Sequence, residues 1–327
     1  MIATTLFGSL LIASASAPDS LAVVNPELRS VATAILRAQQ SAHGNLPSPR
    51  QPPLPAGVVE RSVPGRPGQP AVPVYVVDAA PPGMGARGAI LFIHGGGYIG
   101  GNGWSDLPRL LGLADRLGCL IVSVEYRLAP ETRFPGALED NYAALKWLHA
   151  NAGALRVDPK RIILLGESAG GGHAAMLAIA ARDRGEVPIA LQALVYPMLD
   201  DRTGSTRPAA PQNGTLIWQP ADNRKGWSAL LGRPAGSAQV PAGSVPARVT
   251  DLRHLPPTFI EVGSIDLFAE EDVDYARRLI GAGVPTELLV VPGAFHGFQF
   301  MVPKSAIAQQ FNTALEAALS RALAAPR

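Results

Sequence analysis

The chain has 327 residues, of which 47% are apolar and 17% are charged, and its formal net charge is +2. This supplies enough apolar side chains for a large core, and the length suits one large α/β domain with an insertion, or two domains. Lys and Arg are spread along the chain without a basic block or stripe, which argues against nucleic acid as a partner. The single cysteine, Cys119, excludes a disulfide framework within the chain and is interpreted as a small buried hydrophobe.

Residues 1–24 form an apolar N-terminal segment. The stretch "TTLFGSLLIASASA" (4–17) has the length of a signal peptide and ends in Ala-Ser-Ala, a small-residue cleavage pattern, but no Lys or Arg precedes it. An apolar helix that docks on the protein explains it equally well. The expected location is therefore cytoplasmic, or exported if residues 1–17 are a cleaved signal peptide. No later run reaches the roughly 18 uninterrupted apolar residues of a membrane span.

Residues 25–70 are expected to hold a helix followed by an arm. The helix is predicted over "PELRSVATAILRAQQ", with Asn25 as N-cap, Pro26 at its first position and Glu27 in its first turn. Residues 44–70 are rich in Pro and Gly, which predicts a linker or surface arm.

Short β-branched runs alternate with helical patterns through residues 71–199 and 251–327. The predicted strands cover 72–77, 89–95, 119–124, 161–166, 191–197, 258–263 and 287–293. The predicted helices cover 105–117, 135–151, 169–184, 270–283 and a last one near 304–323. Strands that are apolar on both faces and alternate with helices predict a mostly parallel sheet covered on both sides. Ligands of such sheets bind outside the carboxyl ends of the strands.

Residues 200–250 interrupt this alternation. They contain Pro, Gly, Asn and Arg without strong periodicity, together with Trp218 and Trp227. An excursion of this length inside a compact domain is usually functional, and large aromatic side chains are rarely left on a solvated loop. The segment is therefore predicted to be a lid, with the two tryptophans as candidate pocket residues; core packing of the lid explains them equally well.

The turn "GESAG" places Ser168 between a predicted strand and a predicted helix. This G-x-S-x-G pattern forms a tight turn that exposes the serine hydroxyl at the top of a sheet. A serine hydroxyl is a weak nucleophile unless a base takes its proton. His296, in "VVPGAFHGF" just past the last predicted strand, is the best placed of the six histidines.

The base in turn needs a carboxylate that fixes its tautomer. Asp266 follows a buried-type strand immediately, whereas the acids at 270–274 lie in a predicted helix, where the helix dipole explains them. The order Ser168, Asp266, His296 is the one expected of this type of sheet. The loop "HGGGY" after an early strand offers backbone N–H groups for a developing oxyanion: Gly96 and Gly97, with Ala169 after the nucleophile.

Six motifs occur in one order from about residue 72 to the C-terminus: "HGGGY", "YRLAPE", "FPGALED", "GESAGGG", "LPPTFIEVGSIDLF" and "AGVPTELLVVPGAFHGF". Together they resemble the bacterial hormone-sensitive-lipase-like (family IV) esterases, a branch of the α/β-hydrolase fold. The segment "NPELRSVATAIL" is similar to the N-terminal cap helix of that family.

The resemblance assigns Ser168 as nucleophile, Asp266 and His296 as its partners, and Gly96, Gly97 and Ala169 as oxyanion donors. It implies an α/β-hydrolase sheet with a cap built from the N-terminal region and residues 200–250. It also implies no metal or cofactor, and hydrolysis of short- to medium-chain acyl esters. Dimers are common among similar proteins, so a homodimer is a candidate assembly, although the sequence carries no interface signal.

Two departures from the family pattern stand near the site. Glu167 precedes the nucleophile where the family more often has Asp, and Leu-Phe follows Asp266 where Pro-Leu is usual.

Other functions fit the sequence less well. An amidase or peptidase could use the same triad, but esters are easier substrates. A ligand-binding protein of this fold would have lost a triad member, and a dehalogenase or epoxide hydrolase would need Asp at position 168.

Overall fold

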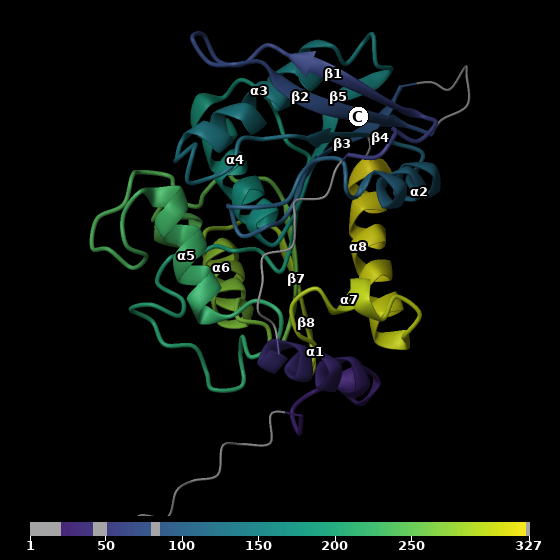
Figure 1. Cartoon of the computed structure of the whole chain (residues 1–327). Coiled ribbons are helices and arrows are strands. Elements are labelled where there is room, and N and C mark those ends of the chain that lie inside the picture. Colours follow the sequence, from purple (N-terminus) through teal and green to yellow (C-terminus); the bar gives the residue numbers. More distant parts are fainter. Residues whose placement is uncertain (1–20, 42–50, 80–85, 325–327) are drawn as a thin grey trace, which may run out of the picture.

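The computed structural model describes residues 21–41, 51–79 and 86–324 (Figure 1). The predicted signal peptide at 1–17 therefore lies outside the described residues. Within them, eight strands form one sheet in the order β1-β2-β4-β3-β5-β6-β7-β8. The strands are β1 (Val58–Val63), β2 (Val72–Asp78), β3 (Arg87–Ile93), β4 (Leu120–Val124), β5 (Val157–Glu167), β6 (Leu191–Val195), β7 (Thr258–Gly263) and β8 (Thr286–Val291). β1 and β4 pair with β2 antiparallel, and the pairs from β4 to β8 are parallel.

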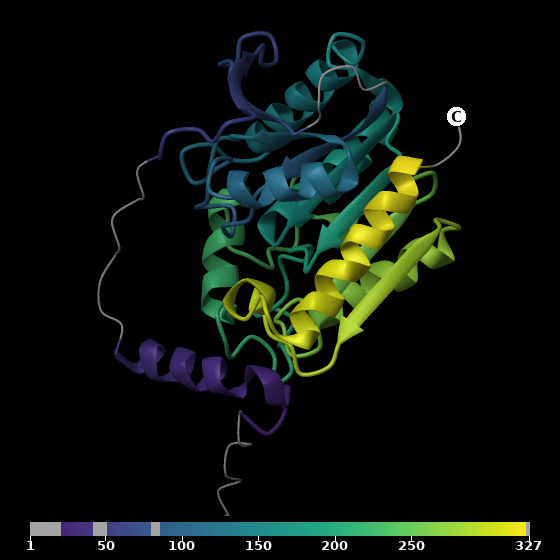
Figure 2. The same cartoon turned by 90° about the vertical axis from the view of Figure 1, so that its right-hand side faces the viewer.

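Helices cover both faces of the sheet, as the alternation predicts. Successive residues of β3 belong to different clusters: Ile90 and Phe92 to one, Leu91 and Ile93 to the other. The first cluster contains side chains of α2 (Leu107–Leu117) and α8 (Ala306–Ala324). The second contains side chains of α3 (Gly136–Ala150), α4 (Ala169–Arg184) and α6 (Ala269–Gly281). Figure 2 shows α8 lying across its face of the sheet.

The arm predicted at 44–70 is wrong over residues 58–63, which form the edge strand β1. Val58 and Val63 are buried, while the four residues between them are exposed. The strand pairs along its whole length with β2, from Val58 opposite Val77 to Val63 opposite Val72. An edge strand exposes most of its side chains, so it lacks the continuous apolar run that marks the inner strands. The sheet therefore begins before residue 71.

The segment 200–250 contains regular structure that its weak periodicity did not predict. Helix α5 (Pro220–Leu231) carries Pro at its first position and a capping box between Gln219 and Asp222. A short 3₁₀ turn, η2 (Pro246–Arg248), follows. Trp227 and Leu230 of α5 belong to the same buried cluster as the side chains of α3, α4 and α6.

The N-terminal helix is α1 (Arg29–Ser41), preceded by a 3₁₀ turn, η1 (Pro26–Leu28). Asn25 caps this turn as predicted, because its side-chain oxygen accepts from the N–H of Glu27. The backbone N–H of Asn25 donates to Gly293 O at 2.9 Å, and Glu27 Oε2 accepts from the N–H of Ala306. The start of the helix is thus tied to the loop after β8.

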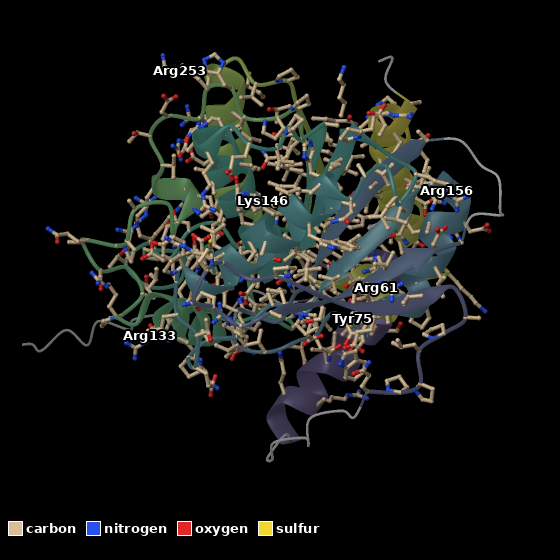
Figure 3. The ribbon with its side chains drawn as sticks, turned by 90° about the horizontal axis from the view of Figure 1, so that it is seen from above. Arg61, Tyr75, Arg133, Lys146, Arg156 and Arg253 are labelled. Carbon is tan, nitrogen blue, oxygen red and sulfur yellow. The ribbon has the colours of Figure 1, made fainter. Side chains whose placement is uncertain are left out.

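Charged side chains are distributed over the outside of the molecule. Seen from above, Arg61, Lys146, Arg156 and Arg253 stand at separate positions (Figure 3). None of the described helices is long and apolar enough to cross a membrane.

Candidate active site

Ser168 lies in a strained turn between β5 and α4. Its backbone has φ 57° and ψ −122°, a conformation that L-residues rarely adopt. The two flanking glycines allow close packing: a Cβ on Gly166 would lie 2.2 Å from Gly170 O, and one on Gly170 would lie 2.0 Å from Ile93 O. The turn therefore needs glycine at both positions, and it lifts the Ser168 side chain to the carboxyl edge of the sheet.

A continuous chain of hydrogen bonds joins the three residues that sequence reasoning selected. His296 Nε2 lies 2.9 Å from Ser168 Oγ, and His296 Nδ1 lies 2.8 Å from Asp266 Oδ2. Asp266 follows β7, and His296 lies in the loop after β8. The other oxygen of Asp266, Oδ1, accepts from the N–H of Phe268 at 3.0 Å. The carboxylate is thereby held in one orientation, which presents Oδ2 to the imidazole.

Two aromatic rings enclose the imidazole of His296. The ring of Tyr196 lies 4.5 Å from it and that of Phe268 lies 5.3 Å from it, centroid to centroid. Only 7% of His296 and 1% of Asp266 is exposed. Exclusion of water strengthens the electrostatic interactions within such a group. Phe268 belongs to the Leu-Phe sequence after Asp266, so this departure from the family pattern places an aromatic wall beside the base.

The glycine loop packs directly against the nucleophile. A Cβ on Gly95 would lie 3.3 Å from Ser168 Cβ, and Gly96 and Gly97 have φ of 124° and 61°. The backbone N–H groups of Gly96, Gly97 and Ala169 have no acceptor among the described residues. Three unused donors beside a nucleophile suit the binding of an oxyanion.

His94 holds the glycine loop and is not a second base. Its ring stacks on Tyr126 at 4.2 Å, and its Nδ1 lies 2.7 Å from Gly95 O. The Tyr126 hydroxyl donates to His94 O at 2.8 Å. Burial lowers the pKa of His94 to about 4 and that of His173 to about 3, so both rings are neutral at pH 7. His173 packs edge-on against Tyr98 and Tyr126, within the core.

A cavity of about 370 Å³ opens at Ser168 and His296. Its remaining lining comes mainly from the glycine loop, the segment before α2 and the loop that carries His296; it includes Asn102, Ser105, Asp106, Glu167, Tyr196, Trp218 and Phe300. Trp218 reaches the cavity because its ring lies over Gly97, where an added Cβ would be 2.1 Å away. Trp218 is thus placed where a pocket residue would be.

Trp227, the other candidate pocket residue, does not line this cavity. It is fully buried, and its ring packs on Tyr98 at 4.9 Å between centroids. Helix α5 is pressed against the glycine loop at this point, since a Cβ on Gly226 would lie 2.3 Å from Gly97 O. The prediction of Trp227 as a pocket residue is therefore wrong: it packs in the core that supports the loop.

Arg109 was missed by sequence reasoning, although it touches the residue before the nucleophile. Its Nη1 lies 2.9 Å from Glu167 Oε1, and its Nη2 lies 3.1 Å from Asp106 Oδ1. Burial raises the pKa of Glu167 to about 7, against the opposing effect of the Arg109 charge. Nothing in the periodicity of α2 marks this pair, because the partners lie on separate elements.

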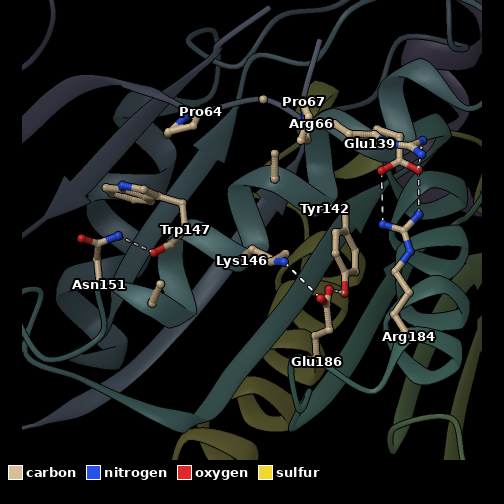
Figure 4. A pocket seen from close by; sticks show the side chains of 13 residues that line it. Pro64, Arg66, Pro67, Glu139, Tyr142, Lys146, Trp147, Asn151, Arg184 and Glu186 are labelled. Carbon is tan, nitrogen blue, oxygen red and sulfur yellow. Dashed lines mark hydrogen bonds and ion pairs between the residues drawn. The ribbon is translucent and has the colours of Figure 1, made fainter. Parts of the chain in front are cut away.

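A larger cavity, about 580 Å³, lies between the segment after β1 and helix α3 (Figure 4). Its charged side chains are already paired. Arg184 Nη2 lies 2.6 Å from Glu139 Oε1, and Lys146 Nζ lies 3.1 Å from Glu186 Oε1. It contains no member of the Ser168 group. Among the described residues, no cluster of three or more His, Cys, Asp or Glu side chains could hold a metal ion.

Comparison with known proteins agrees with this geometry. A family model described as alpha/beta hydrolase fold matches residues 90–300. Carboxylesterase NlhH of Mycobacterium tuberculosis is 35% identical over 239 residues, which cover 72% of this chain and 73% of that protein. Ethyl acetate hydrolase of Pseudomonas putida is 33% identical over 223 residues, 66% of this chain and 67% of that protein.

A solved structure, that of a bacterial heroin esterase, matches with a TM-score of 0.80 and 34% identity. The match covers 94% of this chain and all of that one. The sheet order, the turn at Ser168 and these similarities agree with one another. The chain belongs to the α/β hydrolases, in the branch of the hormone-sensitive-lipase-like (family IV) esterases.

Proposed function

We propose that this protein hydrolyses carboxylic esters of short- to medium-chain acids through a covalent acyl-enzyme on Ser168. The observation that carries the proposal is the hydrogen-bonded chain Ser168–His296–Asp266, with 2.9 Å and 2.8 Å between the paired atoms. This is the arrangement by which a base activates a serine and a carboxylate orients the base.

In the first half of the reaction, His296 Nε2 takes the Ser168 proton while Oγ attacks the ester carbonyl carbon. The carbonyl oxygen becomes an oxyanion, and the N–H groups of Gly96, Gly97 and Ala169 donate to it. Asp266 stabilises the imidazolium. The tetrahedral intermediate then collapses: His296 gives its proton to the leaving alcohol, and the acyl group stays on Ser168.

In the second half, water replaces the alcohol. His296 takes a proton from the water as its oxygen attacks the acyl carbon, and the same three donors hold the second oxyanion. Collapse of this intermediate releases the acid and returns the proton to Ser168. No cofactor enters either half.

The size of the site supports short to medium acyl chains. The cavity at Ser168 measures about 370 Å³, and the Trp218 ring over Gly97 forms part of its wall. Ethyl acetate hydrolase, one of the relatives, acts by its name on an ester of a two-carbon acid. We expect turnover to fall once the acyl chain is longer than this cavity.

We further propose that α1 and residues 200–250 act together as a cap. Trp218 and α5 lie on the glycine loop, and the start of α1 is bonded to the loop that carries His296. Both segments therefore contact loops of the site. Homodimerisation stays a prediction, which light scattering of the purified chain would test.

The test is a set of initial rates on p-nitrophenyl esters from acetyl to palmitoyl, with wild type and Ser168→Ala side by side. The proposal expects rapid turnover of short chains, a decline toward palmitoyl, and no turnover above background in the variant. A folded wild type inactive on every ester would contradict it, as would a Ser168→Ala variant that keeps its rate. p-Nitroanilides of the same acids measure amidase activity under the same conditions.

A further inference from the structure

The cavity at the nucleophile has two carboxylates on its wall, Asp106 and Glu167. A single cation, Arg109, pairs with both of them in the described structure, at 3.1 Å and 2.9 Å. Arg109 is not itself part of the cavity lining. With both acids ionised, the group carries a formal excess of one negative charge, and the carboxylates, not the guanidinium, face the cavity.

Glu167 has a further property that points to a ligand. The residue is 94% buried, with 6% exposed, yet it lines the cavity. Arg109 contacts Oε1. A carboxylate buried this deeply is costly to ionise, and a cationic group of a bound molecule would favour its ionised form.

Aromatic side chains line the same cavity. Tyr196, Trp218 and Phe300 all contribute to the wall, and Phe300 is 47% exposed, which is unusual for a phenylalanine. The guanidinium carbon of Arg109 lies 5.1 Å from the centre of the Phe300 ring. This wall therefore already accommodates one cation against an aromatic ring. Aromatic faces attract alkylammonium groups in the same way.

The placement of these residues selects the alcohol half of the ester. Phe300 belongs to α7 (Phe298–Met301), the short helix directly after His296, and Gly297 between them also lines the cavity. In the proposed mechanism, His296 delivers its proton to the leaving alcohol. The wall next to His296 therefore faces the alcohol, while the glycine loop holds the carbonyl oxygen.

We propose that the cavity preferentially binds esters whose alcohol part carries an alkylammonium group, with Asp106 and Glu167 supplying the charge and the ring of Phe300 a cation-binding face. This inference rests on the proposed function, because an ester must reach Ser168 for its alcohol to lie here. It adds a subsite and a substrate class to that function.

The preference is expected to depend on pH. The groups that act electrostatically on Glu167 are Asp106 just before α2, Arg109 within α2, and His296. Tyr196 and Glu261 also interact with it. Since burial raises the pKa of Glu167 to about 7, its carboxyl group gains negative charge as the pH rises from 6 to 8. Binding of a cation should strengthen over that range.

The test compares two esters of one shape and different charge: choline butyrate and 3,3-dimethylbutyl butyrate, in which carbon replaces the quaternary nitrogen. We expect wild type to favour the choline ester by about tenfold in kcat/KM at pH 8 and low salt. The ratio should fall at pH 6, and it should fall at high salt because counterions screen the carboxylates. A ratio of one or less at pH 8 and low salt would overturn the inference.

Variants test which carboxylates cause the preference for the choline ester, measured as the ratio of the two kcat/KM values. Glu167→Gln and Asp106→Asn should each bring the ratio toward one. Asp115→Asn is the matched control, since Asp115 is an exposed acid on the same helix, outside the cavity lining. Any general loss of activity or folding affects both esters and cancels in the ratio. An unchanged ratio in both cavity variants would contradict the assignment.

Failure of this inference is distinguishable from failure of the proposed function. An enzyme that hydrolyses p-nitrophenyl butyrate but does not prefer the choline ester keeps its function and loses the subsite. If neither the choline ester nor the dimethylbutyl ester is turned over, the two alcohols are tested instead as inhibitors of p-nitrophenyl butyrate hydrolysis. Stronger competitive inhibition by choline than by 3,3-dimethylbutan-1-ol supports the subsite, and equal inhibition overturns it.

Discussion

The carboxyl edge of the sheet and the 200–250 segment beside it are built in different ways. At the edge, each proposed catalytic side chain lies in the turn or loop that follows a strand, where backbone geometry fixes it, as the φ of 57° at Ser168 illustrates. The 200–250 segment has little regular structure apart from α5, and ion pairs to two buried acids hold it in place beside the packing of Trp227. Arg248 Nε lies 2.7 Å from Asp201 Oδ1, and Arg202 Nε lies 2.8 Å from Asp200 Oδ1.

From this difference we expect the edge of the sheet to determine the reaction and the 200–250 segment to determine which ester is accepted. At the edge, Ser168, His296 and Asp266 can hold one fixed arrangement because the strands determine where their loops begin. The 200–250 segment contacts the site chiefly at the glycine loop, where Trp218 and α5 pack against Gly97. Changes in the segment should therefore alter which ester fits, whereas changes at the edge should abolish the reaction.

The largest effect is expected from removing the nucleophile or the base. Ser168→Ala and His296→Ala should each lower kcat by about 10⁵–10⁶-fold, and the double variant should be hardly worse, because the two side chains act as a unit. Steady-state rates on p-nitrophenyl butyrate measure this. Losses that add up in the double variant would contradict a shared mechanism.

Asp266→Asn should be next, with a loss in kcat of about 10⁴-fold. If the amide oxygen of the variant side chain keeps the hydrogen bond from the Phe268 N–H, its NH₂ group faces His296 Nδ1. It must then donate to Nδ1, which selects the wrong imidazole tautomer. The melting temperature should change little. A variant with near-normal kcat would transfer the orienting role to one of the acids at 270–274.

Gly97→Ala tests the point where the two regions meet. The added Cβ would lie 2.1 Å from the Trp218 ring, at a φ of 61°. Displacement of this loop should cost about 10²–10³-fold in kcat through the oxyanion donors. Adding Trp218→Ala removes the clash and should restore part of the rate. A double variant no faster than Gly97→Ala alone would show that backbone strain, not Trp218, causes the loss.

Substitution of the two tryptophans of the 200–250 segment should have different effects, one mainly on substrate preference and the other mainly on stability. Trp218→Ala enlarges the cavity and should shift the preferred acyl chain toward longer esters, at a cost in stability of about 1–2 kcal/mol. Trp227→Ala leaves a void beneath the glycine loop and should cost about 3–5 kcal/mol. Chain-length profiles and denaturant unfolding of both variants make the comparison. Equal shifts in chain preference would contradict the division between wall and core.

The smallest effect on turnover is expected at Glu261, a fully buried acid of β7 whose side-chain oxygens have no partner in the described structure. Burial raises its pKa well above the ordinary value. Above pH 4–5, unfolding therefore releases a proton, and this acid lowers the free energy of unfolding progressively as the pH rises.

Glu261→Gln removes that dependence. The variant should gain stability over wild type between pH 5 and pH 8 and should match it near pH 4, where the carboxyl is protonated in both states. Urea unfolding at three pH values measures the difference. A gain that is independent of pH would contradict a protonated buried carboxyl.

The sequence allowed most of the edge to be predicted because position after a strand largely determines where a side chain points. Ser168, Asp266 and His296 each follow an apolar run, and the structure brings them into contact. The same reasoning could not pair Arg109 with Glu167, because an amphipathic helix pattern does not say which residue on another element its arginine will meet.

The missed elements have identifiable physical reasons. β1 is an edge strand whose middle four residues are exposed, so it lacks an apolar run. Helix α5 has Gly226 in its interior and no clear apolar stripe, although Pro220 and the capping pair of Gln219 and Asp222 mark its start. For Trp227, its size predicted burial, but only the fold shows that it packs on Tyr98.

The most direct test of Ser168 as the nucleophile is to trap the acyl-enzyme. Wild type and Asp266→Asn are mixed with p-nitrophenyl butyrate, quenched in acid within the first turnover, digested and analysed by mass spectrometry. We expect one butyryl group on the peptide that contains Ser168, in amounts stoichiometric with the initial burst of p-nitrophenol. A burst without acylation of Ser168, or acylation of another residue, would contradict Ser168 as the nucleophile.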